Sequence, residues 1–551
     1  MKNPLIWIWK KVRGRIPAVM LLTLSQAAGA LFLVLFALGS RGVIDSAVSG
    51  ETQTFKLACL RQLAVIVGIL VCLTLSRHLR ERLRADLERD WKQQLLHGLL
   101  HGEYAAVSAY HSGELLNRLN NDVSKVNDGI VTILPQAAAM VTRLIAAVAV
   151  LGALDGRFTV VIVAVGAAVI MATAFLRRFL KELNKQVSAW DGKVSAFLQE
   201  IMEKLLMVQA MDVSEEVERR SDSLLEMRYR VQRRRKNASL ATGTGISLLY
   251  YGAGFLALCR CAWLLLQGSM SFGSLTAVIQ LVNQLQAPFV ELSGVLPKYT
   301  AMIASAERLM ELDEIQGEPA PATENAQELY RRMENLCVEG LSFSYDRERI
   351  LENAAFTLPK GAFAVVTGAS GIGKSTLLKL LLGIFKPESG SLYLQSGENR
   401  TELSRTTRRL FAYVPQGNLL LSGTLRENLT IVRPDATEAD LQQALYVSAM
   451  DEFLPQLPLG LDTQLGENGA GLSEGQAQRL AIARAVLGGA PVLLLDECTS
   501  ALDEPTERKV LQRLKETERT CIAVTHRSAA AELCDWHLQV AEGKIRAIQT
   551  K

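Results

Sequence analysis

The sequence predicts two different parts in one chain, an all-α domain that crosses a membrane with six helices and an α/β domain that follows it. Hydrophobic residues make up 49% of the 551 residues, and the mean hydropathy is +0.16. Long apolar stretches recur in the first half of the chain, whereas short strand-like runs alternate with helical runs in the second half. A soluble enzyme of this length rarely has such a hydropathy, so a membrane part joined to a soluble part fits better.

The six expected membrane spans are each close to the ~20 residues that a bilayer requires. They cover residues 16–39, 57–76, 130–153, 158–176, 245–266 and 273–296. The connections 77–129 and 177–243 are long, polar and rich in Arg and Lys, and the first fifteen residues are basic as well. By the positive-inside rule, the N-terminus and both long connections lie on the cytoplasmic side of a plasma or inner membrane. An even number of spans then returns the chain to the cytoplasm.

Four polar side chains within the expected spans are candidates for a ligand cavity in the membrane. Arg143 lies in the third span and Arg260 in the fifth, and Gln280 and Asn283 lie in the sixth. A charge at the bilayer centre costs ~2.5–3.5 kcal/mol unless it faces water or a partner. One interpretation is a polar cavity in which the two arginines attract an anionic or zwitterionic part of a ligand. The other is snorkelling or pairing within the helix bundle.

The composition changes after Leu312, where a polar segment with Pro319 and Pro321 begins. We therefore expect a transmembrane domain over 1–312 with long cytoplasmic helical loops, a linker over 313–327 and a soluble domain over 328–551. Strand-like and helix-like runs alternate in this last part, which indicates a mainly parallel sheet. The net charge of +4 gives no indication of nucleic-acid binding.

The strongest motif is Gly368-Ala-Ser-Gly-Ile-Gly-Lys-Ser-Thr376, which matches the P-loop pattern between an apolar strand and an apolar helix. Its glycines let the backbone wrap phosphates, and the following helix N-terminus favours their charge. Lys374 is expected to reach the β- and γ-phosphates of ATP, and Ser375 to ligate Mg²⁺. The residues expected to hold the nucleotide in this loop are Gly368, Ser370, Gly371, Gly373, Lys374, Ser375 and Thr376.

A second motif is the apolar strand Val492–Leu495 with Asp496 and Glu497 at its end. Asp496 is expected to hold Mg²⁺, mostly through water. Glu497 is expected to act as the general base that polarises the attacking water. Together the two motifs predict a domain that binds ATP and Mg²⁺ and hydrolyses ATP.

Over essentially its whole length, the chain resembles an ABC half-transporter of the exporter type (type IV), with the membrane domain first. The most diagnostic segment is Leu472-Ser473-Glu474-Gly475-Gln476, which resembles the family signature Leu-Ser-Gly-Gly-Gln. In the family this segment caps the ATP held by the opposite subunit, which implies ATP contacts for Ser473, Gly475 and Gln476. Glu474 stands where the family has glycine, and its negative charge near a phosphate is unfavourable.

The resemblance assigns further roles one residue at a time. Tyr345 resembles the aromatic residue that stacks on adenine. Gln416, in Tyr-Val-Pro-Gln, resembles the glutamine that senses Mg²⁺ and contacts the membrane-domain loops. His526, in Val-Thr-His-Arg, resembles the switch histidine that bonds the γ-phosphate. The implied catalytic residues are Glu497, His526, Lys374 and Gln416, and the implied Mg²⁺ ligands are Ser375, Gln416 and Asp496.

Four segments resemble those through which the domains of these transporters touch one another. Residues 466–469 resemble the exporter segment before the signature, and residues 500–503 the segment that crosses between two ATPase domains. The long membrane-domain loops are expected to contact the ATPase domain near residues 103–111 and 203–211.

The resemblance implies ATP-driven transport by alternating access, and it favours export of a small amphipathic, lipid-like, peptide or drug-like cargo. It also implies a dimer, either with a second copy of the chain or with a related half-transporter. The alternatives are an ATP-gated channel or regulator on the same fold, and an importer that uses the exporter fold. An ABC-type ATPase without transport is disfavoured by the six spans. The scaffold does not identify the cargo.

Overall fold

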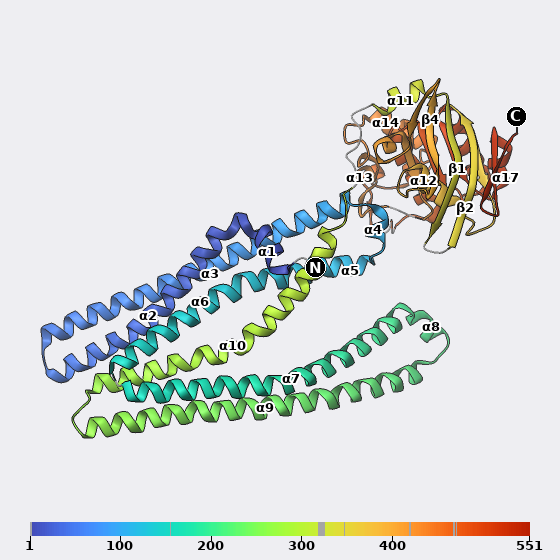
Figure 1. Ribbon diagram of the computed structural model, residues 1–551. Coiled ribbons are helices and arrows are strands. Elements are labelled where there is room, and N and C mark those ends of the chain that lie inside the picture. The colour runs from blue at the N-terminus through green and yellow to red at the C-terminus, as the bar shows by residue number, and fades with distance from the viewer. Residues whose placement is uncertain are drawn as a thin grey trace. The chain divides into compact units, whose positions relative to one another are not determined.

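The computed structural model describes residues 3–154, 156–317, 325–345, 348–417, 420–466, 469 and 471–550. The chain divides into two compact units. The first unit consists of Met1–His97 and Ser112–Glu314, and the second of Gly98–His111 and Ile315–Lys551. Figure 1 shows long helices in the first unit and sheets in the second. A short segment from the first long connection therefore belongs to the C-terminal unit.

The first unit is built of helices that continue well beyond the expected spans. Within it, α2, α6 and α10 pack together and α7 packs along α9 (Figure 1). The helices are α1 (Pro4–Val12), α2 (Ile16–Ser49), α3 (Thr52–His101), α5 (Ser112–Asn117), α6 (Val123–Leu154), α7 (Gly156–Glu203), α8 (Leu205–Ala210), α9 (Ser214–Leu266) and α10 (Phe272–Asp313), with a π-helical turn η2 (Arg118–Asp122) before α6.

Among the described residues, four helical segments are long and apolar enough to cross a membrane. They are Pro4–Ser49, Thr52–His101, Ser112–Leu154 and Ser214–Leu266. They contain four of the six expected spans. The other two, 158–176 and 273–296, lie in α7 and α10, and many of their side chains fall outside the described set.

The packing of the first unit is that of a membrane protein. A buried cluster joins α2, α6, α9 and α10 through residues such as Ala37, Ala147, Ala257 and Leu281, each at most 1% exposed. Small residues let these helices approach closely. On α3, in contrast, large apolar side chains such as Leu60 lie on the surface. A surface of this kind is stable against lipid and unfavourable against water.

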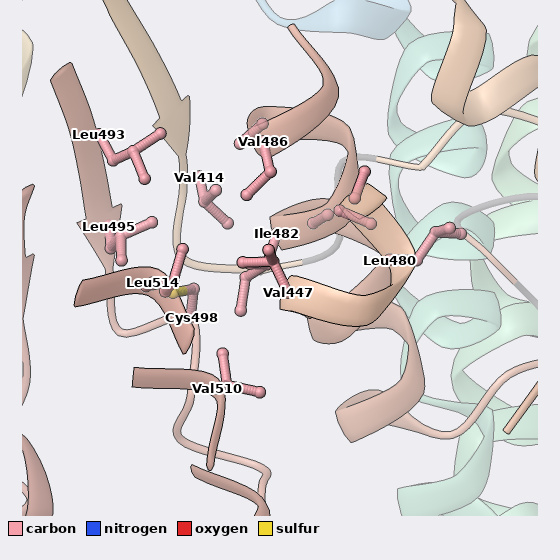
Figure 2. Packing of buried hydrophobic residues seen from close by; sticks show 14 of the residues in the cluster. Val414, Val447, Leu480, Ile482, Val486, Leu493, Leu495, Cys498, Val510 and Leu514 are labelled. Carbon is pink, nitrogen blue, oxygen red and sulfur yellow. The ribbon is translucent and has the colours of Figure 1, made fainter. Parts of the chain in front are cut away.

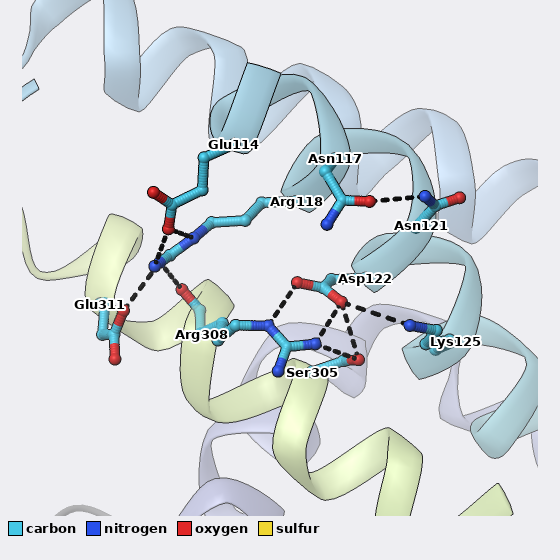
Figure 3. A network of polar contacts seen from close by, with 9 residues as sticks. All are labelled: Glu114, Asn117, Arg118, Asn121, Asp122, Lys125, Ser305, Arg308 and Glu311. Carbon is cyan, nitrogen blue, oxygen red and sulfur yellow. Dashed lines mark hydrogen bonds and ion pairs between the residues drawn. The ribbon is translucent and has the colours of Figure 1, made fainter. Parts of the chain in front are cut away.

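A buried polar network fastens η2 to α10 (Figure 3). The Asp122 carboxylate is fully buried and accepts hydrogen bonds from Ser305 Oγ at 2.9 Å and from Arg308 Nε at 2.8 Å and Nη2 at 2.6 Å. Arg118, 5% exposed, pairs with Glu311 at 2.8 Å and donates to the Arg308 carbonyl oxygen at 2.6 Å. The start of α6 and the end of α10 are therefore held together by charge-assisted bonds in the interior.

The second unit contains the predicted parallel sheet. Its strand order is β12-β11-β3-β10-β9-β6, and every neighbouring pair is parallel except β11 with β12. The strands are β3 (Phe363–Thr367), β6 (Phe411–Val414), β9 (Val492–Asp496), β10 (Thr520–Val524), β11 (Trp536–Ala541) and β12 (Lys544–Gln549). Because β3, β10, β9 and β6 run in one direction, their carboxyl ends meet at one edge, where the predicted motifs lie.

A second, four-stranded antiparallel sheet has the order β2-β1-β4-β5 and was not predicted. Its strands are β1 (Asn335–Tyr345), β2 (Glu348–Pro359), β4 (Ser389–Ser396) and β5 (Asn399–Glu402). Apolar residues of this sheet, such as Leu336 and Leu358, share one buried cluster with Val366 of β3 and with Leu377 of α12 (Lys374–Leu381). The P-loop helix is thus packed between the two sheets.

Helices cover the remaining face of the parallel sheet. Leu493 and Leu495 of β9 share a buried cluster with Ile482 and Val486 of α15 (Figure 2). The other elements of this unit are α4 (Tyr104–Ser108), α11 (Ala326–Arg332), β7 (Gly423–Thr424), α13 (Leu425–Thr430), α14 (Glu438–Val447), β8 (Gln464–Leu465), α15 (Glu474–Leu487), α16 (Glu504–Lys515) and α17 (Ser528–Leu533). This packing fixes the strand ends that carry the site.

Candidate functional site

The P-loop joins β3 to α12 and is shaped by glycine. Gly373 caps the helix with φ +104°, a conformation that side chains disfavour, and a Cβ there would lie 2.4 Å from Ile350 Cγ2. The Lys374 ammonium is held inside the loop, where it donates to the carbonyl oxygens of Gly368 and Ala369, each at 2.9 Å. The loop therefore wraps a cation at a helix N-terminus, which is an arrangement suited to phosphate.

Asp496 lies beside this loop at the end of β9 and is only 2% exposed. Its Oδ1 accepts from Ser375 Oγ at 3.0 Å, and its Oδ2 accepts from the Tyr413 hydroxyl at 3.1 Å. Burial raises the pKa of Asp496 above its ordinary value, although both hydrogen bonds oppose that shift. Burial and the Asp496 charge raise the pKa of Tyr413 as well. A hydroxyl and a carboxylate in contact are oxygen ligands of the kind that Mg²⁺ prefers, so these residues fit that ion.

Glu497 follows in the left-handed region, with φ +49°. Its main-chain N–H donates to the Val524 carbonyl oxygen at 2.9 Å, which holds the strained turn in place. Its carboxylate accepts from Gln416 Nε2 at 2.6 Å, and its other oxygen lies 3.7 Å from His526 Nε2. The side chain is 26% exposed, so water can reach it. Three of the four predicted catalytic residues therefore meet at one point.

Tyr345, at the end of β1, also lies close to the P-loop helix. Its hydroxyl is 3.4 Å from Thr376 Oγ1, and the residue is 38% exposed. Its ring packs edge-on against Phe343 with centroids 5.0 Å apart. An aromatic face with a fixed orientation beside a phosphate-binding loop is suited to stacking on a base.

The signature segment forms the N-terminus of α15. Ser473 caps this helix in a capping box with Gln476, and both Ser473 and Glu474 are exposed. A Cβ on Gly475 would lie 2.9 Å from the Ala501 carbonyl oxygen, so this position has room only for glycine. Among the described residues, no hydrogen bond or ion pair joins residues 472–476 to the P-loop. The N-terminus of α15 is therefore exposed and is not bonded to the P-loop of the same chain among the described residues.

The four candidate cargo residues are not brought to one place. Arg143 lines a cavity of about 350 Å³ together with Arg77 and Arg80 of α3. Arg260 and Asn283 are exposed and do not line this cavity. Gln280 is half-buried and does not line it either.

The first expected coupling segment contacts the ATPase domain within the second unit. Glu103 pairs with Lys386 at 2.8 Å, and the Tyr104 ring lies 6.0 Å from that of Phe385. Residues 203–211 form the end of α7 and α8 in the first unit, and their coupling role stays a prediction. Residues 467 and 468 of the expected exporter segment lie outside the described residues.

Three residues near the site were not predicted. Tyr413 binds Asp496, and Phe385 and Lys386 receive the coupling segment. The sequence signals for these residues were weak. Tyr413 lies in a strand three residues before Gln416, and Phe385 and Lys386 precede a proline in a loop.

Two family models match the chain. The model of the ABC transporter transmembrane region matches residues 18–289, and the ABC transporter model matches residues 351–500. An ATP-dependent lipid A-core flippase of Pseudomonas syringae pv. tomato is 30% identical over 445 residues, which cover 79% of this chain and 72% of that protein. The flippase of the same description from Vibrio vulnificus (strain CMCP6) is 27% identical over 439 residues, which cover 79% and 75% of the two chains.

A solved bacterial Atm1-family ABC exporter with ATP bound has the same fold. It superposes with a TM-score of 0.79 over 98% of this chain and 95% of its own, at 22% sequence identity. The membrane helices, the P-loop domain and these matches lead to one conclusion. The chain belongs to the ABC transporter family, as a multi-pass half-transporter with the exporter fold in which a transmembrane region is joined to an ATPase domain that drives transport.

Proposed function

We propose that two copies of this chain form a homodimer that exports an amphipathic, lipid-like cargo with an anionic group. The observation that carries the cargo class is the cavity that Arg143 lines between α2, α3 and α6. Its walls are largely apolar, with side chains such as Leu33 and Leu73, and three arginines line it as well. An apolar pocket with a few convergent charges is the kind of site that holds an amphiphile.

Two further observations support this cargo class. Arg80 Nε is buried without a hydrogen-bond acceptor among the described residues, so an anion in the cavity would satisfy it. The relatives described as lipid A-core flippases act on a molecule of lipid character. We propose the same broad class here, with Arg143 and Arg80 as anion contacts. Cargo contacts are also proposed for Arg260, Gln280 and Asn283, although these residues do not line the cavity.

At the ATPase site we propose that Lys374 and the P-loop amides hold phosphates and that Tyr345 stacks on adenine. Ser375 and Asp496, with Gln416, supply the ligands of Mg²⁺, which offsets phosphate charge when bound. Glu497 takes the proton of the attacking water. Gln416 and His526 hold its carboxylate in position, and His526 then turns to the phosphate.

The homodimer is proposed because the N-terminus of α15, which carries the signature segment, is exposed and, among the described residues, makes no hydrogen bond or ion pair with the P-loop of the same chain. In this arrangement Ser473, Gly475 and Gln476 of one copy complete the site of the other. With an added thiol oxidant such as copper phenanthroline to accept the two electrons, a chain carrying Ser370→Cys and Ser473→Cys should form an ATP-dependent disulfide between two copies. Ser473→Cys alone is the control and should not. Absence of this cross-link in a folded, ATP-binding sample would contradict the shared site.

The orientation follows from the positive-inside rule, with the N-terminus and the ATPase domain in the cytoplasm. The closure of two ATPase domains would then open the membrane part outward, and hydrolysis would reset it. A channel would not need sustained ATP turnover that rises with cargo, and this distinguishes the two functions.

The cargo proposal is tested by ATPase assays in zwitterionic lipid vesicles, with and without an anionic phospholipid-like amphiphile. The anionic amphiphile should raise turnover in the unaltered chain, whereas a zwitterionic analogue should not. Arg80→Ala and Arg143→Ala should remove the increase. Arg61→Ala is the matched control, because Arg61 is an exposed arginine of the same helix α3 that does not line the cavity. Full stimulation in both cavity variants would overturn the proposed site.

A further inference from the structure

A row of aromatic rings in the second unit connects the candidate base-stacking residue to the coupling segment. Phe385 stands in the middle of this row. Its ring centroid lies 5.5 Å from that of Tyr345 at an interplanar angle of 89°, and 6.0 Å from that of Tyr104 at 70°. Both are edge-to-face contacts within the 4.5–7 Å that aromatic pairs prefer. A displacement of either tyrosine ring therefore changes a contact of Phe385.

Polar contacts hold the coupling segment to the same part of the domain. Lys386, next to Phe385, pairs with Glu103 at 2.8 Å. Arg405 donates to the His101 carbonyl oxygen at 3.2 Å, and the Glu103 N–H donates to the Gln316 carbonyl oxygen at 3.1 Å. The residues just before Tyr104 are thus anchored to this part of the domain, and the Tyr104–Phe385 contact is part of the same interface.

The opposite end of the row is open. Tyr345 is 38% exposed, although Phe343 and Phe385 both pack edge-on against it. Part of the ring is therefore available to a ligand, although two other rings pack against it. A purine that stacks on the ring would restrict its position, and Phe385 is in direct contact with it.

We propose that Phe385 is a positioning residue that passes the presence of a purine on Tyr345 to Tyr104. The coupling segment Gly98–His111 then responds to the base of ATP as well as to its phosphates. This inference rests on the proposed role of Tyr345. The contacts of Phe385 add a second route of coupling to the one through the P-loop. Through this route the coupling segment responds only to nucleotides whose base stacks on Tyr345. Energetic coupling of this kind is reciprocal, so changes at Tyr104 also act on base binding.

The test is hydrogen–deuterium exchange of the full chain in lipid, carrying Glu497→Gln so that bound ATP is retained. Exchange of Gly98–His111 is measured under three conditions: Mg²⁺ alone, Mg²⁺ with ATP, and Mg²⁺ with inorganic tripolyphosphate. ATP should slow exchange in this segment by about a factor of two to ten, the range that one aromatic contact allows. Tripolyphosphate should not.

Phe385→Leu then separates this route from domain closure. In that variant ATP should still bind and still protect the signature segment, but should no longer slow exchange in Gly98–His111. Phe453→Leu is the matched control, because Phe453 is a half-buried phenylalanine in the other core cluster of this unit. It should behave like the unaltered chain.

Three outcomes would overturn the inference. They are equal protection by tripolyphosphate and ATP in the chain with Phe385 intact, retained protection in Phe385→Leu, and no ATP binding at all. The first comparison needs no change at Phe385, so it decides the matter even if Phe385→Leu does not fold. Absence of ATP binding would also contradict the proposed ATP site, whereas the other two outcomes leave that site intact.

Discussion

Asp122→Asn tests whether the buried network at the start of α6 holds this part of the membrane unit together. The substitution keeps the shape of the side chain and removes its charge. Asp122 is fully buried and accepts bonds from both Ser305 and Arg308 (Figure 3). An asparagine keeps one acceptor oxygen, but its NH₂ group would face the Arg308 guanidinium, where both groups are donors.

The expected cost follows from the exposure of the two partners. Hydrogen bonds to charged groups contribute about 1.5–3 kcal/mol, and breaking a buried ion pair costs about 3–5 kcal/mol. The Arg308 side chain is 41% exposed and can regain water, which lowers the cost. We therefore expect a loss of about 2–4 kcal/mol in the stability of the membrane unit.

The assay is thermal unfolding of the purified chain in detergent, followed by tryptophan fluorescence. Asp128→Asn is the matched control, because Asp128 forms a 3.1 Å pair with Arg84 in which both side chains are more than 40% exposed. Such a pair contributes at most about 1 kcal/mol. Asp122→Asn should lower the unfolding temperature by several degrees and Asp128→Asn should barely change it. Equal shifts would refute the account of the network.

Three other substitutions test the ATPase domain. Gly475→Ala should destabilise it by about 1–3 kcal/mol, because the new Cβ would lie 2.9 Å from the Ala501 carbonyl oxygen; thermal unfolding without ATP measures this, and an unchanged midpoint would contradict it. In the proposed homodimer, Glu474→Gln should lower the KM for ATP about two- to fivefold by removing a charge worth about 0.3–1 kcal/mol beside the phosphate site of the other copy; an increased KM would oppose this. Tyr413→Phe should reduce turnover about tenfold or more, since Asp496 loses a hydrogen bond worth about 1.5–3 kcal/mol; unaltered kcat would show that Tyr413 does not position Asp496.

Much of the ATPase site could be predicted because its motifs are short and lie at strand ends. The P-loop, Asp496 and Glu497 each follow an apolar strand, and parallel strands bring such ends to one edge. The strands β3, β6, β9 and β10 were predicted for the same reason, since each is a short apolar run. The strands β11 and β12 have polar residues between the apolar ones and were not predicted. The helices of the membrane unit were predicted from their apolar length.

The antiparallel sheet could not be predicted because its strands carry little pattern. β1 contains Gly340 at φ +61° and several register shifts, which interrupt the alternation of buried and exposed residues. β4 reads Ser-Gly-Ser-Leu-Tyr-Leu-Gln-Ser, which is as polar as a loop. The pairing of distant strands, rather than local sequence, decides their structure.

The contacts of Tyr413 and Phe385 depend on neighbours far away in the sequence. Tyr413 and Asp496 are 83 residues apart, and no local spacing brings them together. Phe385 contacts Tyr104, which lies in the second unit. The expected membrane domain over 1–312 would have placed Tyr104 in the other domain. The domain boundaries at 312 and 328 stay predictions. The gathering of Arg143 with Arg77 and Arg80 likewise follows from helix packing, which the sequence pattern does not specify.

The most direct test of the central claim, that this chain alone is a complete ATP-driven transporter, is its ATPase rate after purification without other chains and reconstitution in lipid. The account predicts sustained turnover that an anionic amphiphile raises and that Glu497→Gln lowers by about a hundredfold or more. A well-folded sample with no turnover would contradict the homodimer and indicate a missing partner chain. Turnover that survives Glu497→Gln would contradict the assignment of the catalytic base.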